Sequence, residues 1–184
     1  MQSKRLFASW LVINFLVVML CVSSDITFAL APQYETALKQ NLWLIIWKHP
    51  KYTWGGAESE EKGIDCSGYL YLAAKRAGIP VRRTTAIQME SGLAGWTGKK
   101  VTLDDAGELD ILWWTWPSSP HRKHGHVGFF LVNNRGSKLL EVTHSSSSKG
   151  VIIQQLRGSL LRDISSIKRL TIGDKQQNGN GTEK

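Results

Sequence analysis

The sequence predicts an α+β domain, in which helices precede an antiparallel run of strands. Apolar residues recur at helical spacing in the first half of the chain, over 33–47 and 66–77. Beyond residue 100 the period changes, and short apolar runs alternate with turn residues, a pattern typical of strands. Helices followed by strands indicate the α+β class, and a chain of 184 residues suits a single core.

Two helices are predicted in the first half. The first covers Gln33–Trp47 and ends before His49-Pro50, because the residue preceding a proline disfavours helical geometry. The second covers Cys66–Ala77. It begins after Asp65, a good N-cap residue, and stops at Gly78.

The second half is predicted to form strands, after a short helix near 86–91. The strands cover 101–103, 110–116, 125–132, 138–144 and 150–156. The last apolar segment, 160–172, fits either a helix or a strand. Trp43, Trp47 and Trp113 are expected to pack in the core, because they fall within apolar stretches of these elements.

The first 31 residues have the order of a secretory signal peptide. Lys4 and Arg5 precede the apolar run 6–22, and the small-residue sequence 29–31 follows. Pro32 is a poor fit directly after a cleavage site, and the apolar run is long enough to begin to span a bilayer. An uncleaved N-terminal anchor is therefore the alternative. Either reading predicts export to the periplasm, the cell envelope or the extracellular space.

The remaining chain divides into a body and a tail. Residues 32–172 are expected to form the folded domain, and 173–184 a disordered tail, because the tail has no apolar residue. The formal net charge of +8 suits an anionic partner such as cell wall, lipid or nucleic acid. A charge of this size also keeps a protein soluble, so charge alone does not choose among these partners.

Cys66 is the most informative residue of the chain. It is the only cysteine outside the leader, whose Cys21 follows a leucine rather than the small residue of a lipoprotein site. A lone exported thiol is an inert buried residue, an intermolecular link or a reactive group. Cys66 falls in the first helical turn after Asp65, where free N–H groups and the helix dipole favour a thiolate. We therefore expect a nucleophile with a lowered pKa.

Two histidines are predicted to meet on neighbouring strands. A hairpin symmetric about Arg135 places His126 directly opposite His144, with Cβ atoms roughly 5 Å apart. Cys66 against this sheet then has a base and an orienting group, as acyl transfer by a thiol requires. The alternative is a zinc site formed by His124, His126 and His144.

At this point the chain resembles the NlpC-type cysteine peptidases, bacterial cell-wall endopeptidases with a papain-like α+β fold. The motifs that carry the resemblance keep the family's order and spacing, and they are Tyr52–Gly56, Asp65–Gly68, Arg83–Thr85 with Gln88, Gly125–Gly128 and Val142–Ser145. The resemblance implies that Cys66 is the nucleophile, His126 the base and His144 the orienting residue. It also implies a Tyr52 hydroxyl near the substrate and cleavage between γ-D-glutamate and the diamino acid of the peptidoglycan stem peptide.

Further contacts with the stem peptide are expected from residues near the motifs. The candidate substrate-binding or oxyanion residues are Tyr52, Asp65, Ser67, Arg83 and Trp116. Trp116 borders a basic insertion, 116–124, that departs from the family pattern. We expect no metal, no organic cofactor and no nucleic-acid partner. Contact with a membrane is expected only through the leader, if it is uncleaved.

Two alternatives to a peptidoglycan endopeptidase stay open. One is an amidase or acyltransferase that uses the same triad on another acyl donor. The other is a catalytically silent wall-binding module, although retention of Cys66, His126 and His144 argues against it.

Overall fold

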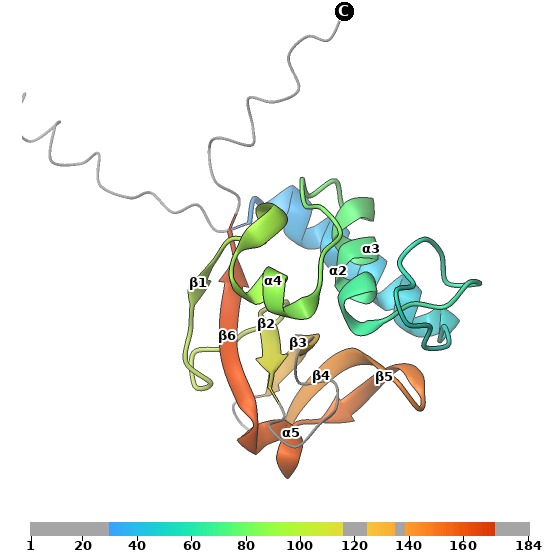
Figure 1. Ribbon diagram of the computed structural model, residues 1–184. Helices are drawn as coiled ribbons and strands as arrows, with labels where there is room; N and C mark the ends of the chain where they lie inside the picture. Colours follow the sequence, from blue (N-terminus) through green and yellow to red (C-terminus); the bar gives the residue numbers. More distant parts are fainter. Residues whose placement is uncertain (1–29, 116–124, 135–138, 172–184) are drawn as a thin grey trace, which may run out of the picture.

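The protein was analysed as a computed structural model, which describes residues 30–115, 125–134 and 139–171. Figure 1 shows α2 and α3 packed together beside a curved sheet, with α4 in front of it. The helical segments are α2 (Pro32–Lys48), α3 (Cys66–Arg76), α4 (Ala86–Glu90), the 3-10 turn η1 (Leu93–Gly95) and α5 (Ser159–Arg162). No helix within the described ranges is long and apolar enough to cross a membrane.

One antiparallel sheet of six strands forms the second half of the fold, and its strand order is β1-β6-β2-β3-β4-β5. The strands are β1 (Gly98–Lys100), β2 (Ile111–Trp114), β3 (His126–Asn134), β4 (Leu139–Ser146), β5 (Gly150–Gln155) and β6 (Ile164–Leu170). The predicted α+β class is confirmed: α2, α3 and α4 precede the antiparallel strands, and the short α5 falls between β5 and β6.

Both faces of the sheet are covered. The larger core lies between the helices and one face, where Leu42 and Ile45 of α2 and Tyr69 of α3 are fully buried with Trp113 and Phe129 of the sheet. A smaller core covers the other face and contains Leu112, Trp114, Phe130, Val142 and Leu160. Adjacent residues such as Trp113 and Trp114 therefore point into different cores, as the alternation of side chains along a strand requires.

Two expectations from the sequence are corrected, and one segment that it left open is resolved. Trp43 and Trp47 are not core residues, since they are 43% and 83% exposed on the outer side of α2. The strand expected at 101–103 lies earlier, at Gly98–Lys100, where it pairs with β6. The ambiguous segment 160–172 contains the end of α5 followed by β6, which inserts between β1 and β2. That central position is a long-range contact that local periodicity does not record.

Candidate active site

Cys66 is the first residue of α3. The helix begins there because the Asp65 carboxylate accepts a hydrogen bond from the backbone N–H of Gly68 at 2.6 Å, as an N-cap does. The Cys66 side chain is 8% exposed and is a free thiol. The predicted helix and its cap are confirmed, and they place the sulfur at a helix N-terminus.

Asp65 also ties the preceding loop to the helix. Its second oxygen accepts from the backbone N–H of Gly55 at 2.9 Å and from the Arg83 guanidinium at 2.6 Å. The loop approaches α3 so closely that a Cβ on Gly68 would lie 1.9 Å from the carbonyl oxygen of Gly56. Only glycine fits at position 68, and this close approach brings Tyr52 to the cysteine.

Arg83 connects this network to the cavity wall. Besides the ion pair with Asp65, its guanidinium donates to the Ser67 hydroxyl at 2.6 Å and to the Thr84 carbonyl. The Arg83 side chain is 28% exposed, so one part of it still faces solvent. Arg83 thus holds Asp65 and Ser67 in place while presenting positive charge at the cavity.

The two histidines lie on the same face of β3 and β4 but are not directly opposite each other. The ladder pairs Phe129 with Thr143 and places Gly128, rather than His126, beside His144. The predicted register is therefore wrong by two residues, and a β-bulge at Leu131 interrupts the same ladder. A shift of two residues preserves the face, because side chains alternate with a period of two. His126 Nε2 accordingly lies 2.8 Å from His144 Nδ1.

The ring of Trp114 packs against both histidine rings. Its ring centroid lies 5.5 Å from that of His126 and 6.2 Å from that of His144. The indole N–H donates to the Leu160 carbonyl at 2.6 Å, which fixes the ring. A Cβ on Gly128 would meet both Trp114 and the Cβ of His144, at 3.3 and 3.0 Å. The glycine of the His-Val-Gly sequence thus leaves room for this packing.

The outer nitrogen of His144 has a partner that sequence analysis missed. His144 Nε2 lies 3.1 Å from Gln154 Oε1 on β5. The ladder pairs His144 with Ile152, so Gln154 is the diagonal neighbour on the same face. The β4–β5 hairpin register could have identified it, but a lone glutamine in a strand carries no motif.

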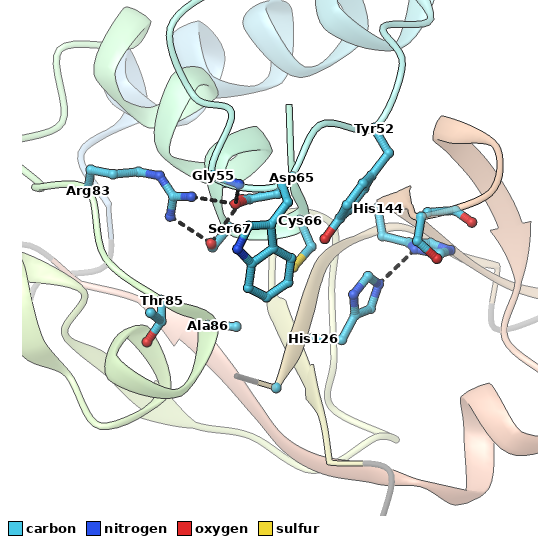
Figure 2. A pocket seen from close by; sticks show the side chains of 14 residues that line it. Tyr52, Gly55, Asp65, Cys66, Ser67, Arg83, Thr85, Ala86, His126 and His144 are labelled. Atoms are coloured by element: carbon cyan, nitrogen blue, oxygen red, sulfur yellow. Dashed lines mark hydrogen bonds and ion pairs between the residues drawn. The ribbon is translucent and has the colours of Figure 1, made fainter. Parts of the chain in front are cut away.

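Cys66 and the two histidines line one cavity of about 320 Å³. Figure 2 shows the Cys66 sulfur, the Tyr52 hydroxyl and the His126 ring pointing toward one another at its centre. The predicted site residues along its wall are Tyr52, Asp65, Cys66, Ser67, Arg83, His126 and His144. Trp116 and His124 lie outside the described residues. Among the residues that are described, no cluster of three or more His, Cys, Asp or Glu side chains could hold a metal ion.

Burial holds the central groups in their neutral forms. It lowers the pKa of His126 to about 3, with a smaller contribution from His144, and it lowers the pKa of His144 as well. It raises the pKa of Cys66 to about 11, and the adjacent Asp65 acts in the same direction. The lowered thiol pKa expected from the helix N-terminus is therefore wrong: desolvation outweighs the backbone hydrogen bonds from Ser67 and Val127 and the charge of Arg83.

The match to known proteins agrees with this geometry. The model of the NlpC/P60 family matches residues 49–167. The chain belongs to the NlpC/P60 family. This is a family of peptidoglycan hydrolases whose members are generally cysteine peptidases.

Several proteins are similar to this NlpC/P60 chain over most of its length. The bifunctional muramidase/DL-endopeptidase CwlT of Bacillus subtilis is 28% identical over 130 residues, which are 71% of this chain and 34% of CwlT. Two solved structures share the fold. An NLP/P60-family protein of Staphylococcus aureus, described as similar to lipoprotein, has a TM-score of 0.59 at 15% identity, over 82% of this chain and 46% of that one. The peptidoglycan hydrolase RipB of Mycobacterium tuberculosis has a TM-score of 0.50 at 18% identity, over 75% and 68%. This chain thus spans about a third of CwlT and under half of the staphylococcal protein.

The half-buried His126 and the buried His144 make the stability of this NlpC/P60 domain sensitive to acid. Their folded pKa values lie below the ordinary value near 6.5, so their contribution is present above about pH 6.5 and is lost as the pH falls below it, down to about pH 3 for His126. We expect the free energy of unfolding in urea to fall by about 1.4 kcal/mol per pH unit for each proton that only the unfolded chain binds. A His126→Gln/His144→Gln double variant should show a shallower fall. Equal slopes for both proteins would contradict the burial argument.

Proposed function

We propose that this protein is an exported cysteine endopeptidase that hydrolyses peptidoglycan stem peptides, at the bond between γ-D-glutamate and the diamino acid. The observation that carries the proposal is the meeting of Cys66, His126 and His144 in one cavity, with the two imidazoles 2.8 Å apart. Membership of the NlpC/P60 family and the DL-endopeptidase name of CwlT support the substrate class. The basic leader followed by an apolar run supports export.

In the first step the Cys66 sulfur attacks the amide carbonyl carbon. Because burial keeps the thiol and the imidazole neutral at rest, the proton moves to His126 as the carbon–sulfur bond forms. The oxyanion is held by the backbone N–H of Cys66 and by the Tyr52 hydroxyl. Burial raises the pKa of Tyr52 to about 12, so this hydroxyl keeps its proton and can donate.

In the second step His126 gives its proton to the leaving amine, and the carbon–nitrogen bond breaks. The product is a thioester on Cys66. His126 then takes a proton from water, whose oxygen attacks the thioester carbonyl. The carbon–sulfur bond breaks, the sulfur regains a proton, and the free carboxylate leaves.

Substrate binding is assigned to the wall opposite the histidines. Arg83 presents positive charge there beside Ser67, and both line the cavity. Stem peptides carry carboxylates, so this charge favours their binding. Asp65 keeps the wall in place through its four hydrogen bonds. Trp116 is retained as a candidate contact at the basic insertion.

The deciding experiment is digestion of purified peptidoglycan, followed by mass analysis of the soluble fragments. We expect fragments with a new amine on the diamino acid and a new carboxyl on D-glutamate, and none with Cys66→Ser. Fragments cut at another amide, or acyl transfer to an added amine, would support the amidase or acyltransferase alternative. Sedimentation of the protein with the wall without any cleavage would identify a silent binding module.

Chelation separates the thiol mechanism from the zinc alternative. Since the proposed steps use only protein groups, activity should be unchanged in excess EDTA, and the purified protein should contain less than stoichiometric zinc by elemental analysis. Loss of activity on chelation with recovery on adding zinc would instead favour a site that includes His124, His126 and His144.

A further inference from the structure

Gln154, His144 and His126 form a row of three hydrogen-bonded side chains, and His126 lies at the end of this row nearest Cys66. His144 Nε2 lies 3.1 Å from Gln154 Oε1, and His144 Nδ1 lies 2.8 Å from His126 Nε2. His144 is buried and His126 is half-buried. Gln154, on β5, is exposed and forms the outer end of this row of three side chains. Figure 2 shows the bond between the two rings.

The orientation of the Gln154 amide, which presents its oxygen Oε1 rather than its NH2 group to His144, fixes the protons along this row of groups. An amide oxygen only accepts, so His144 Nε2 must carry the proton that it donates to Gln154. A neutral imidazole has one N–H, so His144 Nδ1 is bare and accepts from His126 Nε2–H. His126 Nδ1 then carries no proton and can take one from the Cys66 thiol.

The alternative pair of tautomers would prevent His126 from acting as the base. If His144 Nε2 accepted a hydrogen bond, its Nδ1 would donate to His126 Nε2. His126 would then hold its proton on Nδ1 and could not accept another while neutral. Water at the position of Gln154 can either donate or accept, so it does not select between the two orders.

We propose that Gln154 is a positioning residue that selects the tautomers of His144 and His126, and so keeps His126 Nδ1 ready to accept the thiol proton. The inference rests on the proposed function for its effect on rate. Its effect on the tautomers follows from the bonds that join Gln154, His144 and His126.

The first test replaces Gln154 by methionine, which keeps the length of the side chain and removes the acceptor. We expect kcat for stem-peptide hydrolysis to fall about 3- to 10-fold, the effect of one hydrogen bond that water partly replaces, with KM unchanged. Gln155→Met is the matched control, because the neighbouring residue on β5 points to the other face. It should keep the wild-type kcat.

The second test replaces Gln154 by glutamate, which keeps the acceptor and adds a charge. A carboxylate stabilises the His144 imidazolium, whose Nδ1–H blocks the required proton order at low pH. The acidic limb of the kcat/KM profile should therefore move to higher pH, with activity near wild type once His144 is neutral. The titratable groups that face His144 are His126 on β3 and, across the cavity, Cys66, Tyr52 and the Asp65–Arg83 pair.

A spectroscopic readout separates the two proposals. Nitrogen-15 NMR of the histidine rings, assigned with His126→Gln and His144→Gln, should show protons on Nε2 of both rings in the wild type. Gln154→Met should give mixed tautomers, and Gln155→Met should not. Unchanged tautomers and unchanged kcat in Gln154→Met would overturn the role of Gln154 while Cys66→Ser stays inactive. If hydrolysis does not depend on Cys66, the proposed function fails, and the tautomers still report on Gln154.

Discussion

Replacing Cys66 by serine is expected to abolish stem-peptide hydrolysis, with a loss on the order of 10³-fold or more in kcat. Serine has nearly the same size, so it fits the buried position at the start of α3 and preserves the Asp65 cap. The serine hydroxyl is a far weaker nucleophile than a thiol, and the neutral imidazole of His126 cannot activate it comparably. The rate of fragment release from purified peptidoglycan measures the effect.

The other cysteine provides the matched control. Cys21→Ser makes the same substitution at a position outside the described residues and should leave hydrolysis unchanged. Circular dichroism and urea unfolding should show that Cys66→Ser is folded, with a change in stability of about 1 kcal/mol or less. A folded and fully active Cys66→Ser protein would remove Cys66 from the nucleophile role.

The second large effect is expected when the two histidines are replaced. The test is the ranking of the losses in kcat among the variants. His126→Ala should cost nearly as much kcat as the loss of Cys66, because nucleophile and base act as one unit. His144→Ala should cost less, about 10- to 100-fold, because it removes an orienting hydrogen bond rather than the base. His144→Asn or His144→Gln should recover part of this loss, since an amide can still accept from His126 Nε2.

Two further histidines serve as references for this series. His49 ends α2 in a left-handed conformation, which asparagine tolerates, so His49→Asn should keep full activity. His124→Ala should change only substrate affinity, and more at low salt than at high salt, because the charge of a basic segment acts through fields that salt screens. Equal losses in His124→Ala and His126→Ala would show that the triad is assigned to the wrong side chains.

The sequence by itself determined the local elements around the thiol. Asp65 followed by Cys66 and an apolar run, with Gly78 after it, specifies a capped helix through contacts within a few residues. The same holds for the Gly-Gly turn and for the strands that begin at His126 and Gly150. The family motifs add their order and spacing, and the family match confirms the resemblance to the NlpC-type family.

The sequence also predicted that the two histidines lie on the same face of the sheet, but it did not predict which residues of β3 and β4 are paired. Alternation along β3 and β4 depends only on parity, so a register error of two residues left His126 and His144 on one side. The actual offset depends on the bulge at Leu131, where one strand gains a residue. Packing of Trp114 and Gly128 against His144 accompanies that offset, and no local pattern encodes it.

Only the tertiary structure decided the protonation of the site and its outermost partner. A helix N-terminus alone favours a thiolate, but in the folded protein Cys66 is only 8% exposed, and this burial raises its pKa and keeps the thiol neutral. The bond from His144 to Gln154 likewise requires a third strand to pair in one register. Local capping and alternation are short-range and can be read along the chain. Desolvation and cross-strand pairing depend on contacts between residues that are distant in the sequence, so they arise only once the chain has folded.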